Sequence, residues 1–343
     1  MAHQPIETAL AAHRLPRAHS QSGNQQCPQM SHSRISVLAS GQVKPGPAAS
    51  LVKKRSARFD AGMDYAECPA PDDLRRYAQC LWILRDDAPG DAIQTIYPDG
   101  RCELLAELGV PLRFHGVDGG IRADQPLCFA AQQRGPIRLQ AAGVVHCIGL
   151  RLAPACSALI AGARLPGLRD HAPDLCTLDA AFAADFRRAA QDSARAASPE
   201  PLWRLLRAHC AGFAPDPLAE RAVELLDAQF GDLRIAELAS RLGVSLRTLQ
   251  ARFLDAVGMT PKEYARVRRL QALLHALDAE DAGIAAAAAR HGYSDQAHAT
   301  HDLARWTGTT PARLVRALRG DRDGQDAIRL AAAFVRGTSA MAS

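Results

Sequence analysis

The fold of this chain is decided by residues 235–257, which read IAELASRLGVSLRTLQARFLDAV. The pattern predicts a short helix from Ile235 to Leu242, a tight turn at Gly243-Val244, and a second helix from Ser245 to about Val257. Glycine permits the chain reversal, and a serine at a helix start accepts hydrogen bonds from the first turn. A helix-turn-helix unit requires this order, because its second helix must project outward into a major groove.

The same arrangement recurs at residues 284–306, which read IAAAAARHGYSDQAHATHDLARW. Here the pattern predicts a helix over 284–290, a turn at His291-Gly292-Tyr293, and a capped helix from Ser294 to Trp306. Between the units, one helix is expected from Pro261 to about Ala279, with a length of roughly 27 Å at about 1.5 Å per residue. Successive major grooves on one DNA face are roughly 34 Å apart, so this connector would present both units in register.

These residues resemble the AraC/XylS family of bacterial transcription regulators over about one hundred residues. The resemblance depends on the Gly-Tyr-x-Asp-Gln-x-His stretch at 292–298 and the Thr-Gly-x-Thr-Pro ending at 307–311, with Gly258-Met259-Thr260-Pro261 at the matching place in the first unit. It implies an activator or repressor that binds double-stranded DNA at operators or promoters. It also implies frequent dimerisation, control by a small effector, and RNA polymerase as a candidate partner.

Carried onto matching positions, the resemblance makes Arg247, Gln250 and Ala251 the base-facing residues of the first unit, with Ser245 and Thr248 near phosphate. Arginine suits guanine and glutamine suits adenine by paired hydrogen bonds. The family more often has arginine at the position of Ala251, which could offer only a methyl contact to thymine.

The neighbouring Arg252 is expected to point away from the bases, toward the DNA backbone or solvent. In the second unit we expect less selective reading, because Ala287 and Ala299 are smaller than their usual family counterparts and forfeit buried area at roughly 0.8 kcal/mol per methylene. Alternatively, His298 stabilises the turn that precedes the second recognition helix and does not contact DNA. The candidate DNA-facing residues of the second unit are Ser294, Gln296, Ala297, His298, Thr300 and His301.

The region before the helices has a different pattern, with short apolar runs separated by turn signals between residues 79 and 152. Pro98-Asp99-Gly100 is one such turn. The pattern predicts a small antiparallel β domain, barrel or sandwich in form. Trp82, Tyr97-Pro98-Asp99-Gly100 and residues 149–154 also resemble a sensor domain attached to some regulators of the family. The expected runs are 80–84, 93–97, 102–108, 127–131, 137–139 and 144–152.

The whole chain is therefore predicted to be an α+β protein. Residues 1–62 are rich in polar residues, proline and glycine, end near Lys53-Lys54-Arg55, and are expected to be disordered, with Met63 as a candidate natural start. Residues 63–165 form the β domain, 166–216 a helical linker, 217–320 the DNA-binding domain and 321–343 a tail. The linker helices either join domains and pair subunits, or cover the β domain's own core.

Composition favours a cytoplasmic protein without a cofactor. The chain has 343 residues, a formal charge of +5 and nine cysteines, none at zinc-ligand spacing. An odd number of scattered cysteines fits a reducing compartment, and no apolar run is long enough to span a membrane. Basic residues outnumber acidic ones between 233 and 319, which suits contact with phosphates.

Three other functions compete with this reading. His115, His146 and Cys147 with Glu103 suggest a metal-dependent, cupin-like enzyme, although their spacing matches no metal motif. The cysteines of the β domain could form a thiol sensor, but their apolar neighbours favour buried, unreactive sulfurs. Degenerate helix-turn-helix units could serve protein interaction alone. We expect a regulator and not an enzyme.

Overall fold

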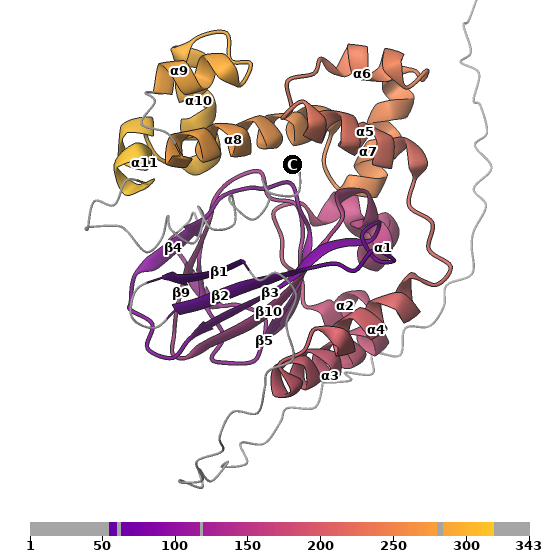
Figure 1. Ribbon diagram of the computed structural model, residues 1–343, viewed down its shortest axis with the longest axis vertical. Coiled ribbons are helices and arrows are strands. Elements are labelled where there is room, and N and C mark those ends of the chain that lie inside the picture. Colours follow the sequence, from indigo (N-terminus) through magenta and orange to yellow (C-terminus); the bar gives the residue numbers. More distant parts are fainter. Residues whose placement is uncertain (1–54, 60–62, 117–118, 280–283, 319–343) are drawn as a thin grey trace, which may run out of the picture. The chain divides into compact units, whose positions relative to one another are not determined.

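The computed structural model of the chain describes residues 55–59, 63–116, 119–279 and 284–318. Strands occupy the N-terminal part of these residues and helices the C-terminal part, which confirms the predicted α+β class (Figure 1). None of the helices in the described ranges combines the length and the apolar character that a membrane crossing requires.

The strands form two antiparallel sheets. The larger sheet has six strands in the order β1 (Arg55–Phe59), β2 (Met63–Pro69), β3 (Ala78–Asp86), β10 (Val145–Leu152), β5 (Glu103–Glu107) and β8 (Leu127–Ala130). The smaller has four, in the order β4 (Ile93–Ile96), β9 (Ile137–Gln140), β6 (Arg113–His115) and β7 (Ile121–Ala123). Antiparallel pairing throughout confirms the predicted topology class.

The alternation of side chains along β5 separates two environments. Leu104 and Ala106 are buried in the core beneath the helices, whereas Glu103, Leu105 and Glu107 face the opposite side of the sheet. This is the period of two that a strand imposes on its side chains. On the neighbouring β10, Gly149 lies directly against the Trp82 indole, and a Cβ at this position would overlap the ring.

Two helices cover the core face of the large sheet. They are α3 (Ala180–Ala196), which begins where the Asp179 carboxylate accepts the Phe182 N–H at 2.9 Å, and α4 (Glu200–Cys210). Phe186 and Trp203 are buried in one cluster with Leu104. Both helices pack on the β domain's core, which is one of the two roles considered for them. The shorter elements nearby are 3-10 turns at Pro154–Cys156 and Gly162–Leu168, α1 (Ala158–Ala161) and α2 (Leu175–Leu178).

The C-terminal helices share a second core. Figure 1 shows α8 between two groups of helices, with α6 and α7 on one side and α9 and α10 on the other. The α8 bounds match the predicted connector. Leu249, Leu270 and Trp306 belong to one buried cluster, so both units pack on the connector. These helices are α5 (Pro217–Ala228), α6 (Ile235–Arg241), α7 (Leu246–Val257), α8 (Pro261–Ala279), α9 (Ile284–Arg290), α10 (Gln296–Thr307) and α11 (Pro311–Leu318).

The structure corrects three expectations. Residues 55–59, expected to be disordered, form β1 and pair with β2; Lys53 and Lys54 lie outside the described residues. The strands β2, β6 and β7 were not predicted, because they are short or lack a clear alternation of apolar residues. The last correction concerns α10, which begins at Gln296 with Asp295 as its cap, because the Asp295 carboxylate accepts the His298 N–H.

Candidate nucleic-acid interface and buried cavity

The first recognition helix, α7, presents the predicted base-reading residues on its outer face. Gly243 has φ +65° in the preceding turn, and the Ser245 hydroxyl accepts the Thr248 N–H at 3.0 Å. Leu249 is fully buried, so the opposite face of the helix points outward. That face carries the exposed residues Arg247, Gln250 and Ala251, which are spaced three and four apart and therefore lie next to one another.

Arg252 has a fixed partner. Its Nε and Nη2 each lie 2.7 Å from a carboxylate oxygen of Asp216, the residue that caps α5. A two-point arginine–carboxylate contact holds the guanidinium in one plane. Arg252 thus joins α7 to the start of α5 and lies away from the Arg247 side of the helix.

The second recognition helix, α10, uses some of its candidate residues to build its own turn. The Ser294 hydroxyl donates to Asp295 at 3.1 Å and lies 3.2 Å from Nδ1 of His298. The His298 ring packs edge-on against Tyr293, with 5.2 Å between the ring centroids. These contacts agree with the interpretation that His298 fastens the turn. Gln296, Ala297 and His301 are exposed, and Thr300 is partly buried.

The connector holds the second turn through Arg269. Its Nη1 and Nη2 donate to the carbonyl oxygens of Gly292 and Gly231, each at 3.2 Å, and its guanidinium lies over the Tyr293 ring. Gly292 has φ +70°, and a Cβ there would meet the Asp232 carboxylate. The turn of the second unit therefore packs against both α8 and the loop that follows α5.

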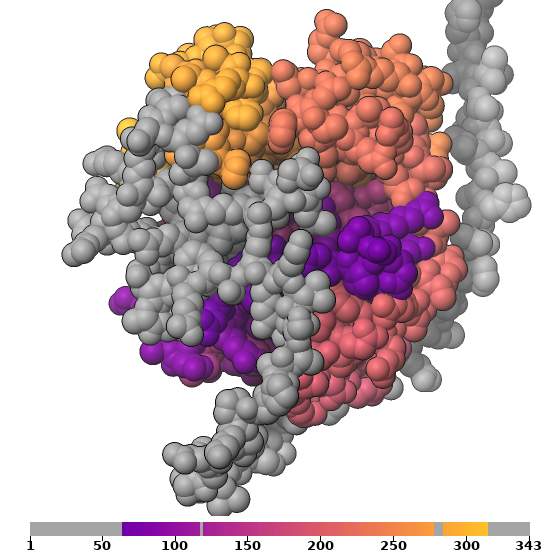
Figure 2. Space-filling model, in the orientation of Figure 1, coloured from indigo at the N-terminus to yellow at the C-terminus, as the bar shows by residue number. Residues whose placement is uncertain are grey.

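Fewer basic side chains are free for phosphate than the composition suggests. Arg268 is buried beside Asp227, and Arg269 donates to the carbonyl oxygens of two turn glycines. Arg241 donates to Glu237 at 2.6 Å. Arg247, Lys262 and Arg313 are exposed, with no ion pair to any part of the chain that the structure describes. In Figure 2 the surfaces of residues 217–257 and 284–318 lie side by side at the top of the view.

A cavity of about 790 Å³ lies between the two sheets of the β domain. This volume suits a small molecule. Apolar and aromatic side chains supply much of its wall, among them Trp82, Leu84, Leu105, Phe114, Leu139 and Val145.

Acidic groups are prominent in the same wall. Glu103 accepts from Arg151 Nε at 2.8 Å and from the Trp82 indole N–H at 3.1 Å. Partial burial of the Glu107 side chain raises its pKa to about 7; the hydrogen bond from the Cys147 thiol lowers that pKa, and Asp124 raises it. Within the described residues, Glu107 Oε2 and Gln94 Oε1 are buried without a hydrogen-bond partner.

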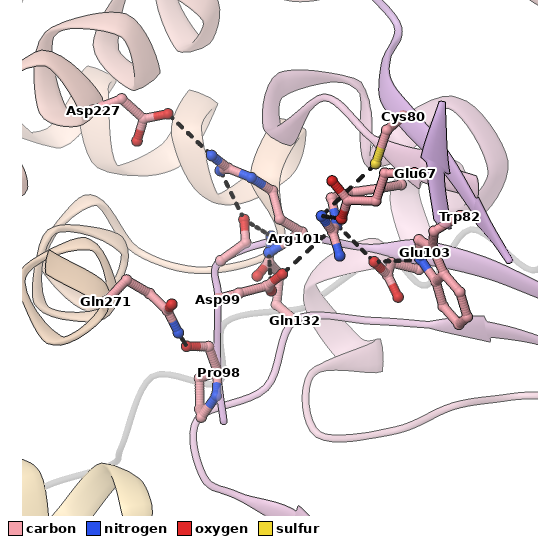
Figure 3. Close-up of polar contacts among 12 residues, drawn as sticks. Glu67, Cys80, Trp82, Pro98, Asp99, Arg101, Glu103, Gln132, Asp227 and Gln271 are labelled. Carbon is pink, nitrogen blue, oxygen red and sulfur yellow. Dashed lines mark hydrogen bonds and ion pairs between the residues drawn. The ribbon is translucent and has the colours of Figure 1, made fainter. Parts of the chain in front are cut away.

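One segment of the wall also contacts the helical region (Figure 3). Asp99 Oδ1 accepts the Arg101 N–H at 2.9 Å and so closes the predicted turn, in which Gly100 has φ +78°. The Arg101 guanidinium then reaches Tyr264 of α8 at 2.5 Å and Asp227 of α5 at 3.2 Å. The Gln271 side-chain amide of α8 donates to the Pro98 carbonyl oxygen and also lines the cavity.

Sequence reasoning identified the turn at 98–100 but missed the roles of Arg101, Gln271, Glu107 and Gln94. The alternation Glu103, Leu105, Glu107 along a strand was a usable signal, because it places two carboxyl groups on one face. Nothing in the local sequence indicates that Arg101 has a partner 126 residues away.

The geometry gives little support to a metal-dependent enzyme or to a thiol sensor. His115 Nε2 lies 3.0 Å from Gln140 Oε1, and His146 and Cys147 alternate to opposite faces of β10. Across the described ranges, no three histidine, cysteine, aspartate or glutamate side chains come together as metal ligands. Burial raises the pKa of both Cys80 and Cys102 to about 12, as expected for unreactive thiols.

Comparison with known proteins agrees with the two-part architecture. A helix-turn-helix domain model matches residues 238–317, and a domain of unknown function, DUF6597, matches residues 66–174. Two capped helices on one connector, together with this match, define a DNA-binding transcription regulator. Residues 238–317 thus form an AraC-type helix-turn-helix domain. No curated protein matches the chain.

Three solved structures show partial similarity. The C-terminal domain of AraT from Geobacillus stearothermophilus is 22% identical, with 29% of this chain and 85% of that chain covered and a TM-score of 0.29. An AraC-type regulator from Chromobacterium violaceum is 24% identical, with 30% and 92% covered and a TM-score of 0.28. ToxT from Vibrio cholerae is 10% identical, with 68% and 97% covered and a TM-score of 0.41.

Proposed function

We propose that this regulator reads operator DNA with α7 and α10 in successive major grooves, and that a small molecule in the β-domain cavity modulates the binding. One observation carries the proposal. The segment from Tyr97 to Arg101 lines the cavity and also makes polar contacts with α8, the helix on which both helix-turn-helix units pack.

The first unit supplies most of the sequence reading in this proposal. Arg247 and Gln250 are exposed side by side. The arginine can donate two hydrogen bonds to a guanine edge, and the glutamine amide can donate one to an adenine edge and accept one from it. Ser245 and Thr248 lie at the N-terminal end of α7, where hydroxyls and backbone N–H groups can meet phosphate. In the second unit, Gln296, Ala297 and His301 remain outward, while Ser294 and His298 are held in their turn.

The coupling follows from shared contacts. A ligand that fills the cavity touches the wall at Tyr97 and Pro98, and any displacement there changes the bonds to Gln271 and Tyr264. Because α8 joins the two units, a change in its position alters how they fit two grooves at once. Binding linkage then requires that DNA and ligand change each other's affinity by the same factor.

The family supports further expectations. We expect a homodimer on paired half-sites, contact with RNA polymerase at promoters, and a cytoplasmic location associated with the nucleoid. These expectations name no individual residue. The dimer and the contact with RNA polymerase can be tested with the full chain bound to its operator.

Selection of binding sites from random DNA by the purified full chain tests the proposed function. We expect a motif that spans two groove-length segments, together with an affinity that falls steeply with salt yet stays sequence-dependent. Recovery of unselected sequences, bound with equal affinity at every salt concentration, would contradict DNA reading and favour the protein-interaction alternative.

A further inference from the structure

The polar groups of the cavity indicate what kind of molecule it accepts, if the proposed ligand control is correct. We infer that the effector is a small organic cation, a primary amine on an apolar body, whose ammonium group is bound by Glu107. Gln94 accepts a second donor group of the same molecule. This inference rests on the proposed function and narrows it to one class of ligand.

The geometry of two side chains supports this class of ligand. Glu107 projects from β5 to the cavity side of the large sheet, and Gln94 lies on β4 of the small sheet, so acceptors reach the cavity from both sheets. Oε2 of Glu107 and Oε1 of Gln94 are buried with no hydrogen-bond partner in the described parts of the chain. A buried acceptor without a donor is costly, and a ligand with N–H groups would satisfy it.

The balance of charge in the cavity wall also favours a cation. The lining contains the six carboxyl groups of Asp86, Asp99, Glu103, Glu107, Asp124 and Asp170. Among the described residues that line it, two carry guanidinium groups, and both are engaged: Arg101 with Tyr264 and Asp227, and Arg122 over the Phe114 ring at 4.4 Å. Three of these carboxyl groups have a cationic partner: Glu103 and Asp99 lie 2.8 Å and 3.9 Å from Arg151 Nε, and Asp170 binds Arg134. An anionic ligand would therefore meet uncompensated carboxyl groups, whereas a cation would be attracted to them.

Much of the remaining cavity wall is apolar or aromatic. Trp82, Leu105 and Phe114 offer aromatic and aliphatic surface to the body of the ligand. Aromatic faces also attract cations. A wholly polar ligand would leave this surface without apolar contact, so the combination fits an amine with a hydrocarbon or aromatic body.

The pH dependence of amine binding tests the role of Glu107 without a mutated chain. Its pKa of about 7 means that the carboxylate form becomes dominant as the pH rises from 6 to 8. The titratable groups that interact with it are Cys147 on β10, Cys128 on β8 and Asp124 before β8. Burial raises the pKa of Cys128 and Cys147, so both thiols stay neutral over this range. Amine affinity should therefore increase with pH until the amine itself loses its proton.

The experiment titrates the full chain by calorimetry with three primary amines, cyclohexylmethylamine, 2-phenylethylamine and tryptamine, each beside its alcohol and carboxylic acid counterpart. We expect at least one amine to bind about tenfold or more tightly than its counterparts, as a charge-assisted hydrogen bond implies. Glu107→Gln should remove that advantage and leave alcohol binding unchanged. Glu224→Gln, an exposed substitution on α5, is the matched control and should bind like the unaltered chain.

Several results would overturn the inference. These are failure of all three amines to bind, an acid or alcohol that binds as tightly as its amine, or amine binding that Glu107→Gln or pH leaves unchanged. Circular dichroism establishes that the variant is folded. Operator affinity measured with and without the amine separates the two claims: an amine that binds without changing DNA affinity supports the ligand class and contradicts the proposed modulation.

Discussion

Arg101 Nη2 lies 3.2 Å from Oδ2 of Asp227, and Tyr264 contacts both residues, at 2.5 Å and 2.8 Å. Arg101 belongs to the β domain, Asp227 to α5 and Tyr264 to the connector α8. Arg101 is buried, and Arg268 adds a second cation 2.7 Å from Asp227. The cavity wall and the DNA-binding helices thus share one buried polar network.

Replacement of Arg101 should be severe. Arg101→Ala leaves Asp227 with a weaker set of partners, and loss of one member of a buried ion pair costs about 3–5 kcal/mol of unfolding free energy. Urea unfolding of the variant measures this cost. The exposed Arg195→Ala on α3 should change stability by less than about 0.5 kcal/mol. Equal stability of the two variants would show that the network contributes little.

Asp227 should make stability depend on acid pH. Burial alone would raise its pKa, but Arg101 and Arg268 hold it below the usual range. A lowered native pKa stabilises the fold above the unfolded value of about 3.9, and this stabilisation is lost as the pH falls through the native pKa. We therefore expect the stability gap between the unaltered chain and Asp227→Asn to narrow from pH 7 to pH 3. A constant gap would contradict the ion-pair explanation, and Asp192→Asn should show little gap at either pH.

The two neighbouring arginines of α7 should behave differently in DNA binding. Arg247→Ala should cost about 1–3 kcal/mol of operator binding and relax selectivity at one base pair. Arg252→Ala, which removes the contact with Asp216, should leave base selectivity intact. Competition binding with operators altered one base pair at a time provides the measurement. The assignment fails if Arg252→Ala relaxes selectivity and Arg247→Ala does not.

Gln271 should transmit the state of the cavity. Gln271→Ala removes the bond to the Pro98 carbonyl and leaves the exposed faces of α7 and α10 unchanged. Operator binding without ligand should persist, while the ligand-dependent change in affinity should shrink. Gln191→Ala on α3 is the control, and it should keep the full response. A full response in Gln271→Ala would indicate that coupling travels by another route.

The turn glycines of the two units offer a matched pair. Both have positive φ, +65° at Gly243 and +70° at Gly292, so alanine costs roughly 1–2 kcal/mol of backbone strain at either position. At Gly243 the added Cβ meets open space, whereas at Gly292 it meets the Asp232 carboxylate. Gly292→Ala should therefore destabilise the chain more than Gly243→Ala in chemical unfolding. The opposite order would mean that the second turn is packed differently.

Local sequence was enough to predict the helix-turn-helix units and the connector. Ser245 and the glycine turns act on residues one to four positions away, and the buried stripe of α7 repeats with the period of a helix. Such interactions are visible in a window of a few residues. The shift from Ser294 to Asp295 as the cap of α10 changed the start of that helix by a residue or two without changing the fold.

Long-range packing decided the features that connect sensing to DNA binding. In the sequence, Arg101 is an ordinary residue after a turn. Its role becomes clear only in the folded chain, where Asp227 and Tyr264, each more than a hundred residues away in sequence, contact it. Glu107 likewise becomes an unusual carboxyl group only because the fold partly buries it between two sheets. Burial and charge pairing between distant segments depend on how side chains meet in three dimensions, and a linear pattern does not contain that information.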